Sequence, residues 1–96
     1  MNLKQLIQQK RRQVLEIAQR HGATNLRVFG SVARGEAGER SDLDLLVEME
    51  PGRSLLDLVA VKQDLEELLG CKVDVVTEAA VSPYLRDRVL SEAIRL

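Results

Sequence analysis

The segment FGSVARGEAGERSDLDLLVEM, Phe29 to Met49, constrains the fold and chemistry of this chain more than any other. Its second half has the composition of a buried strand, yet it contains Asp42 and Asp44. An isolated carboxylate removed from water is costly and usually takes up a proton instead. The segment therefore predicts that a positively charged group lies on the face that carries the two aspartates.

The composition excludes several classes of protein. The 96 residues predict one domain, 1–96, and a formal charge of −1 provides no basic surface for nucleic acid. Aromatic residues make up only 2% of the chain, so stacking platforms for bases are nearly absent. Its apolar runs are too short to span a bilayer, and its first residues do not resemble a signal peptide. We therefore expect a cytoplasmic protein that binds neither membrane nor nucleic acid.

The reactive side chains narrow the choice of metal site. Cys71 is the only cysteine and His21 the only histidine. An internal disulfide, a multi-cysteine zinc site and a histidine-rich metal centre are therefore excluded.

Helical and strand patterns alternate along the chain. Helices are predicted at Asn2 to Arg20, Ser54 to Gly70, and Ser82 to about Leu90. Strands are predicted at Asn25 to Phe29, Asp42 to Glu48, and Lys72 to Thr77, and the final EAIRL either continues the last helix or forms an edge strand. This order predicts a small α/β (α+β) fold in which helices cover a short mixed sheet.

Two details of the helices are predicted from single residues. Ser54 and Asp57 have the spacing of a capping box, which fixes the start of the second helix. Tyr84, the only tyrosine, follows Ser82-Pro83 at the start of the last helix. We predict that its ring is a partly buried anchor.

The predicted strands bring carboxylates together. Side chains alternate along a strand, so Asp42, Asp44 and Leu46 face one way and the apolar residues between them face the core. The Cα atoms of the two aspartates are about 6.6 Å apart along the strand, so their carboxylates can converge on one cation or bracket a metal pair roughly 3.5–4 Å apart. Asp74 offers a third carboxylate if its strand is a neighbour. Hard oxygen ligands without histidine or cysteine predict Mg²⁺ bound together with substrate phosphates.

The connection between the first two strands contains candidate phosphate ligands. Gly30 and Ser31 stand where a helix can begin, and the free N–H groups at such a start bind anions. Arg34 and Arg40 can add positive charge against a triphosphate. Each feature alone also has a structural explanation: a turn, an exposed strand face, or arginines paired with Glu36 and Glu39. The ordered combination favours a nucleotide–metal site.

Gly30-Ser31, ten intervening residues and then Asp42-Leu43-Asp44 resemble the GSx10DxD signature of the nucleotidyltransferase superfamily with the DNA polymerase beta-like fold. The short chain resembles the minimal nucleotidyltransferase branch of that superfamily, the MntA-like antitoxins encoded beside HEPN ribonuclease toxins. The resemblance covers essentially the whole chain. It implies that Asp42 and Asp44 are catalytic and bind Mg²⁺, that Asp74 is the third catalytic and metal-binding carboxylate, and that Gly30-Ser31 holds the nucleotide phosphates.

The resemblance also implies a reaction and a partner. In that family an acceptor hydroxyl attacks the α-phosphorus of ATP in a Mg²⁺-dependent step, with two ions expected, and pyrophosphate leaves. The implied acceptor is a tyrosine of a cognate HEPN toxin, which adenylylation silences. Two alternatives stay open: an antitoxin that acts by stoichiometric binding alone, and the catalytic subunit of a two-subunit enzyme that modifies a small molecule. Pairing of the chain with itself also stays open.

Overall fold

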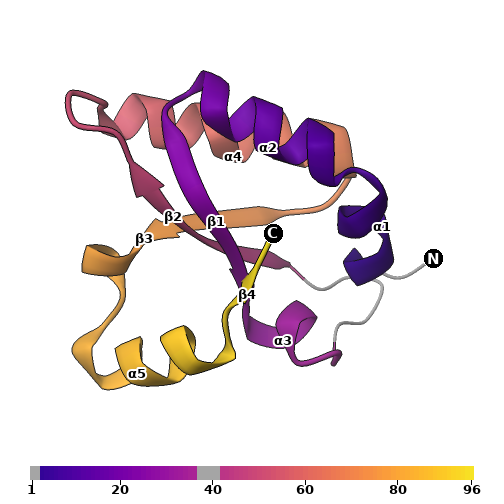
Figure 1. Cartoon of the computed structure of the whole chain (residues 1–96), viewed down its shortest axis with the longest axis vertical. Coiled ribbons are helices and arrows are strands. Elements are labelled where there is room, and N and C mark those ends of the chain that lie inside the picture. The colour runs from indigo at the N-terminus through magenta and orange to yellow at the C-terminus, as the bar shows by residue number, and fades with distance from the viewer. Residues whose placement is uncertain (1–2, 37–41) are drawn as a thin grey trace.

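The computed structural model describes residues 3–36 and 42–96, which form a four-stranded sheet with helices on both faces (Figure 1). The strand order is β3-β2-β1-β4, with β1 antiparallel to both β2 and β4, and β2 parallel to β3. The strands are β1 (Ala23–Phe29), β2 (Leu43–Met49), β3 (Val73–Thr77) and β4 (Ile94–Arg95). The predicted mixed sheet covered by helices is confirmed.

The helices divide between the two faces of this sheet. They are α1 (Leu3–Gln9), α2 (Arg11–Arg20), α3 (Gly30–Ala33), α4 (Leu55–Leu69) and α5 (Pro83–Glu92), with a 3-10 turn η1 (Glu78–Ala80) before α5. Figure 1 shows α2 and α4 side by side along one face and α3 and α5 along the other. Only the α2–α4 side contains the main hydrophobic core.

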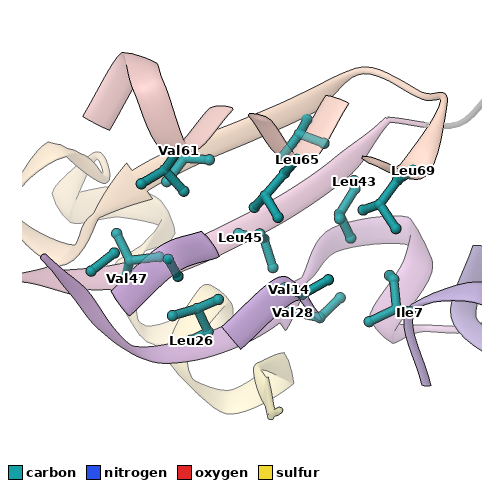
Figure 2. Packing of buried hydrophobic residues seen from close by; sticks show 14 of the residues in the cluster. Ile7, Val14, Leu26, Val28, Leu43, Leu45, Val47, Val61, Leu65 and Leu69 are labelled. Carbon is teal, nitrogen blue, oxygen red and sulfur yellow. The ribbon is translucent and has the colours of Figure 1, made fainter. Parts of the chain in front are cut away.

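The core is formed by the alternating strand residues that the pattern predicts. Leu43, Leu45 and Val47 of β2 are fully or almost fully buried and meet Val61 and Leu65 of α4 (Figure 2). Val14 of α2, Leu26 and Val28 of β1, and Leu69 of α4 complete the layer. Because alternation sends these side chains to the α2–α4 side, Asp44 necessarily points to the other face.

The capping box of α4 is confirmed. The Ser54 hydroxyl accepts a hydrogen bond from the Leu56 N–H at 3.2 Å, and the Asp57 carboxylate accepts one from the Ser54 N–H at 2.9 Å. These bonds satisfy donors that the helix start would otherwise leave open.

The prediction of one continuous N-terminal helix is wrong. The helix divides at Lys10, which has φ −101° and ψ 15°. Ile7 and Val14 are both buried, but the six residues between them are all polar, so no apolar stripe holds the intervening turn against the core. The Lys10 ammonium donates to the Leu68 carbonyl at 3.3 Å, which fastens the break to α4. The predicted cap, Asn2, lies outside the described residues.

The other boundaries differ from prediction by a few residues. β1 begins at Ala23 rather than Asn25, because a bulge between Thr24 and Arg27 accommodates Asn25 at φ 50°. β2 begins at Leu43 and β3 at Val73, each one residue later than predicted.

The C-terminal end of the chain contains one wrong prediction. α5 runs to Glu92, and the last residues form the edge strand β4, one of the two predicted alternatives. The Tyr84 side chain, predicted to be a partly buried anchor, is instead 96% exposed. It lies in the first turn of α5 on the side that faces away from the sheet. Within residues 3–36 and 42–96, no helix is long and apolar enough to cross a membrane.

Candidate active site

A row of side chains crosses three strands on the α3–α5 face of the sheet. The register pairs Phe29 of β1 with Asp44 of β2, and Asp44 with Asp74 of β3. Residues paired in this way share one face, so the carboxylates of Asp44 and Asp74 lie on adjacent strands. Asp42, directly before β2, is exposed, as is Asp74, whereas Asp44 is half-buried. The structure thus brings the three predicted carboxylates to the N-terminal ends of β2 and β3.

Gly30 places the start of α3 directly against Asp44. Its φ of +74° is a left-handed conformation that residues with a Cβ rarely adopt. A Cβ at this position would also collide with Oδ2 of Asp44. Both the backbone and the position of the carboxylate therefore favour glycine here, and the predicted pairing of the Gly-Ser turn with the acidic strand is visible in the fold.

Among the described residues, the charges that act on the pKa of Asp44 are mostly negative. Burial raises the pKa of the Asp44 carboxyl above its ordinary value of 3.8, and the charges of Asp74 and Asp42 raise it further. Arg34 acts in the opposite direction but contributes least. Like charges held this close favour a bound cation or a proton.

The donor set fits magnesium. All three candidate ligands are carboxylates, the hard oxygen donors that Mg²⁺ prefers. A bound Mg²⁺ would neutralise the negative charge of Asp44 and of its acidic neighbours. In the described part of the chain, no three His, Cys, Asp or Glu side chains are already drawn together in the geometry of a metal cage. Carboxylates repel one another without a cation between them, so an open arrangement is expected for Mg²⁺ that binds together with substrate phosphates.

Ser31 is in α3, and Arg34 directly follows this helix. Ser31 is half-buried in the first turn of this helix. Arg34, at its end, is held by two ion pairs: Nε lies 2.9 Å from Glu36 and Nη1 lies 3.0 Å from Glu92. These carboxylates raise the pKa of the arginine, mainly through the hydrogen bonds to Glu36 and Glu92. Arg40, the other predicted phosphate ligand, lies outside the described residues.

Three residues that sequence reasoning missed also lie on this face. Glu92 links α5 to α3 through Arg34, at a separation of 58 residues that no local pattern reveals. Arg27 pairs with Leu46 across the sheet, so it shares the face of Asp44. Side chains alternate along a strand, so the position of Arg27 two residues before Phe29 could have placed both on the same face from the sequence alone. Arg86, on α5, has no comparable sequence signal.

Comparison with known proteins agrees with this geometry. The model of the "Nucleotidyltransferase domain" family matches residues 10–96. The chain is 48% identical to "Putative protein adenylyltransferase MJ0435" of Methanocaldococcus jannaschii over 92% of this chain and 95% of that protein. It is 40% identical to "Protein adenylyltransferase MntA" of Thermococcus cleftensis over 82% of this chain and 80% of that protein.

Solved structures share the fold. One described as a "putative minimal nucleotidyltransferase" is 55% identical and superposes with a TM-score of 0.87 over 100% of this chain and 97% of the other. A toxin-antitoxin complex with AMP-PNP contains a chain that is 20% identical, with a TM-score of 0.74 over 88% of this chain and 69% of the other. The second likeness concerns the fold alone. The family model, the close relatives and the shared fold show together that this chain is an enzyme of the nucleotidyltransferase family.

Proposed function

We propose that this nucleotidyltransferase is a Mg²⁺-dependent protein adenylyltransferase that moves AMP from ATP to a tyrosine hydroxyl of a cognate HEPN toxin and thereby acts as its antitoxin. The row of Asp44 and Asp74, with Gly30 against Asp44, is the observation that carries the proposal. The names of the relatives support AMP transfer to protein. The requirement for ATP is consistent with the cytoplasmic location expected from the sequence.

The reaction joins an acceptor oxygen to the α-phosphorus of ATP. The bond between that phosphorus and the oxygen that leads to the β-phosphate breaks, and pyrophosphate leaves with the electron pair. When bound, Mg²⁺ neutralises charge on the phosphates and makes the α-phosphorus more electrophilic. Asp42 and Asp44 are the residues that would hold it. Such transfers depend on positioning and charge neutralisation more than on covalent participation by the protein.

Asp74 has a different role in this proposal. It is exposed on the β3 side of Asp44, where an incoming hydroxyl can approach from solvent. Its carboxylate oxygen accepts the hydroxyl proton as the acceptor oxygen attacks, and it completes the set of metal ligands. On the opposite side, Gly30 and Ser31 at the start of α3 receive the phosphates. Phe29 gives this helix no side-chain cap, which leaves the first N–H groups available to an anion.

Exposed apolar surface also favours a protein acceptor. Exposed apolar side chains at the start of α4, Leu55 and Leu56, are available to such a partner.

Mass spectrometry of the partner tests the proposal. A candidate HEPN toxin from the same host would be co-expressed with the wild type, with Asp44→Asn and with Glu67→Gln, an exposed change on α4, on the opposite face of the sheet from the site. We expect the toxin to gain the mass of AMP with the wild type and with Glu67→Gln only, and to lose the added mass when its modified tyrosine is changed to Phe. An unmodified toxin that is nevertheless captured and inhibited would instead show an antitoxin that acts by binding alone.

A further inference from the structure

Two arginines on the site face have buried donors for which the described residues supply no acceptor. Among the described residues, the buried side-chain nitrogen atoms without a hydrogen-bond partner are Nε and Nη2 of Arg27 and Nε of Arg86. A guanidinium group stays charged at every physiological pH, so it cannot escape this cost by losing a proton. Buried donors in native proteins are nearly always paired. These three atoms therefore have unused hydrogen-bonding capacity that the oxygen atoms of an incoming ligand can accept.

Both arginines face the space between the sheet and α5. Arg27 is opposite Leu46, one step along the sheet from the Phe29–Asp44 pair, and therefore on the same face as Asp44. Leu46 is 0% exposed although it points away from the main core, so this face is covered. α5 packs against β1 and lies along this side of the sheet (Figure 1).

The pattern of exposure along α5 turns Arg86 inward. Arg86, Val89 and Glu92 are half-buried and three residues apart, so they share the helix face that meets the sheet. Tyr84 and Leu85, on the other side, are exposed. Glu92, the inward carboxylate of α5, is already paired with Arg34 and Arg88 at 3.0 and 3.2 Å. It is therefore not available to neutralise Arg86.

We propose that Arg27 and Arg86 form a phosphate-binding subsite that holds the pyrophosphate portion of the nucleotide. The planar fork of arginine matches phosphate oxygens, and charge-assisted bonds of this kind are stronger than neutral ones. The choice of a nucleoside triphosphate as ligand rests on the nucleotidyl transfer proposed above. The subsite is distinct from the carboxylates: it is positively charged and lies on β1 and α5, whereas Asp44 and Asp74 lie on β2 and β3.

The order of the strands places this subsite on the leaving-group side. In an in-line displacement, the acceptor and the leaving group lie on opposite sides of the α-phosphorus. Asp74 of β3 is on one side of Asp44, while Arg27 of β1 is on the other. α3, which begins at Gly30 directly after β1, lies on this second side as well. Positive charge here would stabilise the pyrophosphate as its bond to the α-phosphorus breaks.

Binding measurements test the subsite without requiring transfer. Pyrophosphate and AMP would be titrated separately, with Mg²⁺, into the wild-type protein and into its Arg27→Met and Arg86→Met variants. We expect each arginine change to weaken pyrophosphate about tenfold and to leave AMP binding within twofold. Arg20→Met, at an exposed position of α2 on the opposite face of the sheet, is the control that removes a charge away from the subsite, and it should change neither affinity. Because no acceptor is present, this result is independent of whether the chain modifies a toxin.

The folded state supplies a second measurement. Met replaces an unpaired buried charge with an apolar side chain of similar length, so both variants should unfold at a temperature equal to or above that of their parent. Arg27→Lys and Arg86→Lys, which keep the charge without the fork, should retain part of the pyrophosphate affinity and provide the test if either Met variant does not fold. Unchanged pyrophosphate affinity in the arginine variants would overturn the proposal. So would a loss confined to AMP, which would assign the donors to the nucleoside or to a phosphate already on the acceptor.

Discussion

Replacing Gly30 with alanine perturbs the contact on which the site depends. The new residue must adopt φ +74°, which costs about 1–2 kcal/mol for a residue with a Cβ. Its Cβ also meets Oδ2 of Asp44, and the carboxylate can relieve the collision by rotating, at a cost of about 0.5–1.5 kcal/mol for an unfavourable rotamer. The free energy of unfolding should therefore fall by about 1.5–3.5 kcal/mol.

Gly35→Ala is the matched control for the backbone term. Gly35 has the same φ of +74°, but a Cβ there would have no neighbour within 4 Å. It should lose only the backbone contribution, about 1–2 kcal/mol. Urea unfolding of both variants measures the difference, which isolates the collision with Asp44.

Activity separates the two variants more sharply than stability. Movement of Asp44 by about 1 Å should reduce AMP transfer on the order of 10²-fold in Gly30→Ala, because phosphoryl transfer depends on positioning. Gly35→Ala should keep transfer within a few-fold of the wild type when both are assayed well below their unfolding temperatures. Equal transfer by the two variants would refute the reasoning that Gly30 positions Asp44.

Three further predictions concern stability. Leu65→Ala removes a side chain that is 0% exposed and should cost about 2–5 kcal/mol in denaturant unfolding, whereas Leu56→Ala, at a position 79% exposed on the same helix, should change stability by less than about 0.5 kcal/mol. Hydrogen bonds from Lys62 and the β3 backbone hold the pKa of Glu66 below 4.5, so its contribution is present above that pH and is lost as pH falls through the lowered value. Glu66→Gln should therefore lower Tm at pH 7 and converge with the wild type in acid; a constant difference would contradict this assignment. Mg²⁺ with a non-hydrolysable ATP analogue should raise the Tm of the wild type, and removal of the metal with EDTA or the change Asp44→Asn should abolish the rise.

Features set by neighbouring residues were predictable. The alternation in β2 sends Leu43 and Leu45 to the core and Asp44 to the opposite face, as its period of two requires. The capping box of Ser54 and Asp57 depends on residues three apart, and it is present. The proximity of Asp44 and Asp74 was predicted only on the condition that their strands are neighbours, since adjacency of the strands is a property of the fold rather than of either segment.

Features that depend on packing between distant parts of the chain were not predictable from the sequence. The break at Lys10 follows from how Ile7 and Val14 both reach the core, which a helical pattern alone does not reveal. Tyr84 was judged from its neighbours, but α5 turns it away from the sheet. The Arg34–Glu92 pair depends on how α5 packs beside α3. Long-range contacts of this kind require the tertiary structure.

Transfer of label from ATP tests the central claim most directly. Purified protein would be incubated with Mg²⁺, α-labelled ATP and lysate of its own host, in parallel with Asp44→Asn and with Glu67→Gln, and the protein, RNA and small-molecule fractions would then be separated. We predict that label appears on one protein band with the wild type and Glu67→Gln and is absent with Asp44→Asn. Label confined to RNA or to a small molecule, or equal labelling by Asp44→Asn, would contradict the account of a protein adenylyltransferase that depends on this carboxylate.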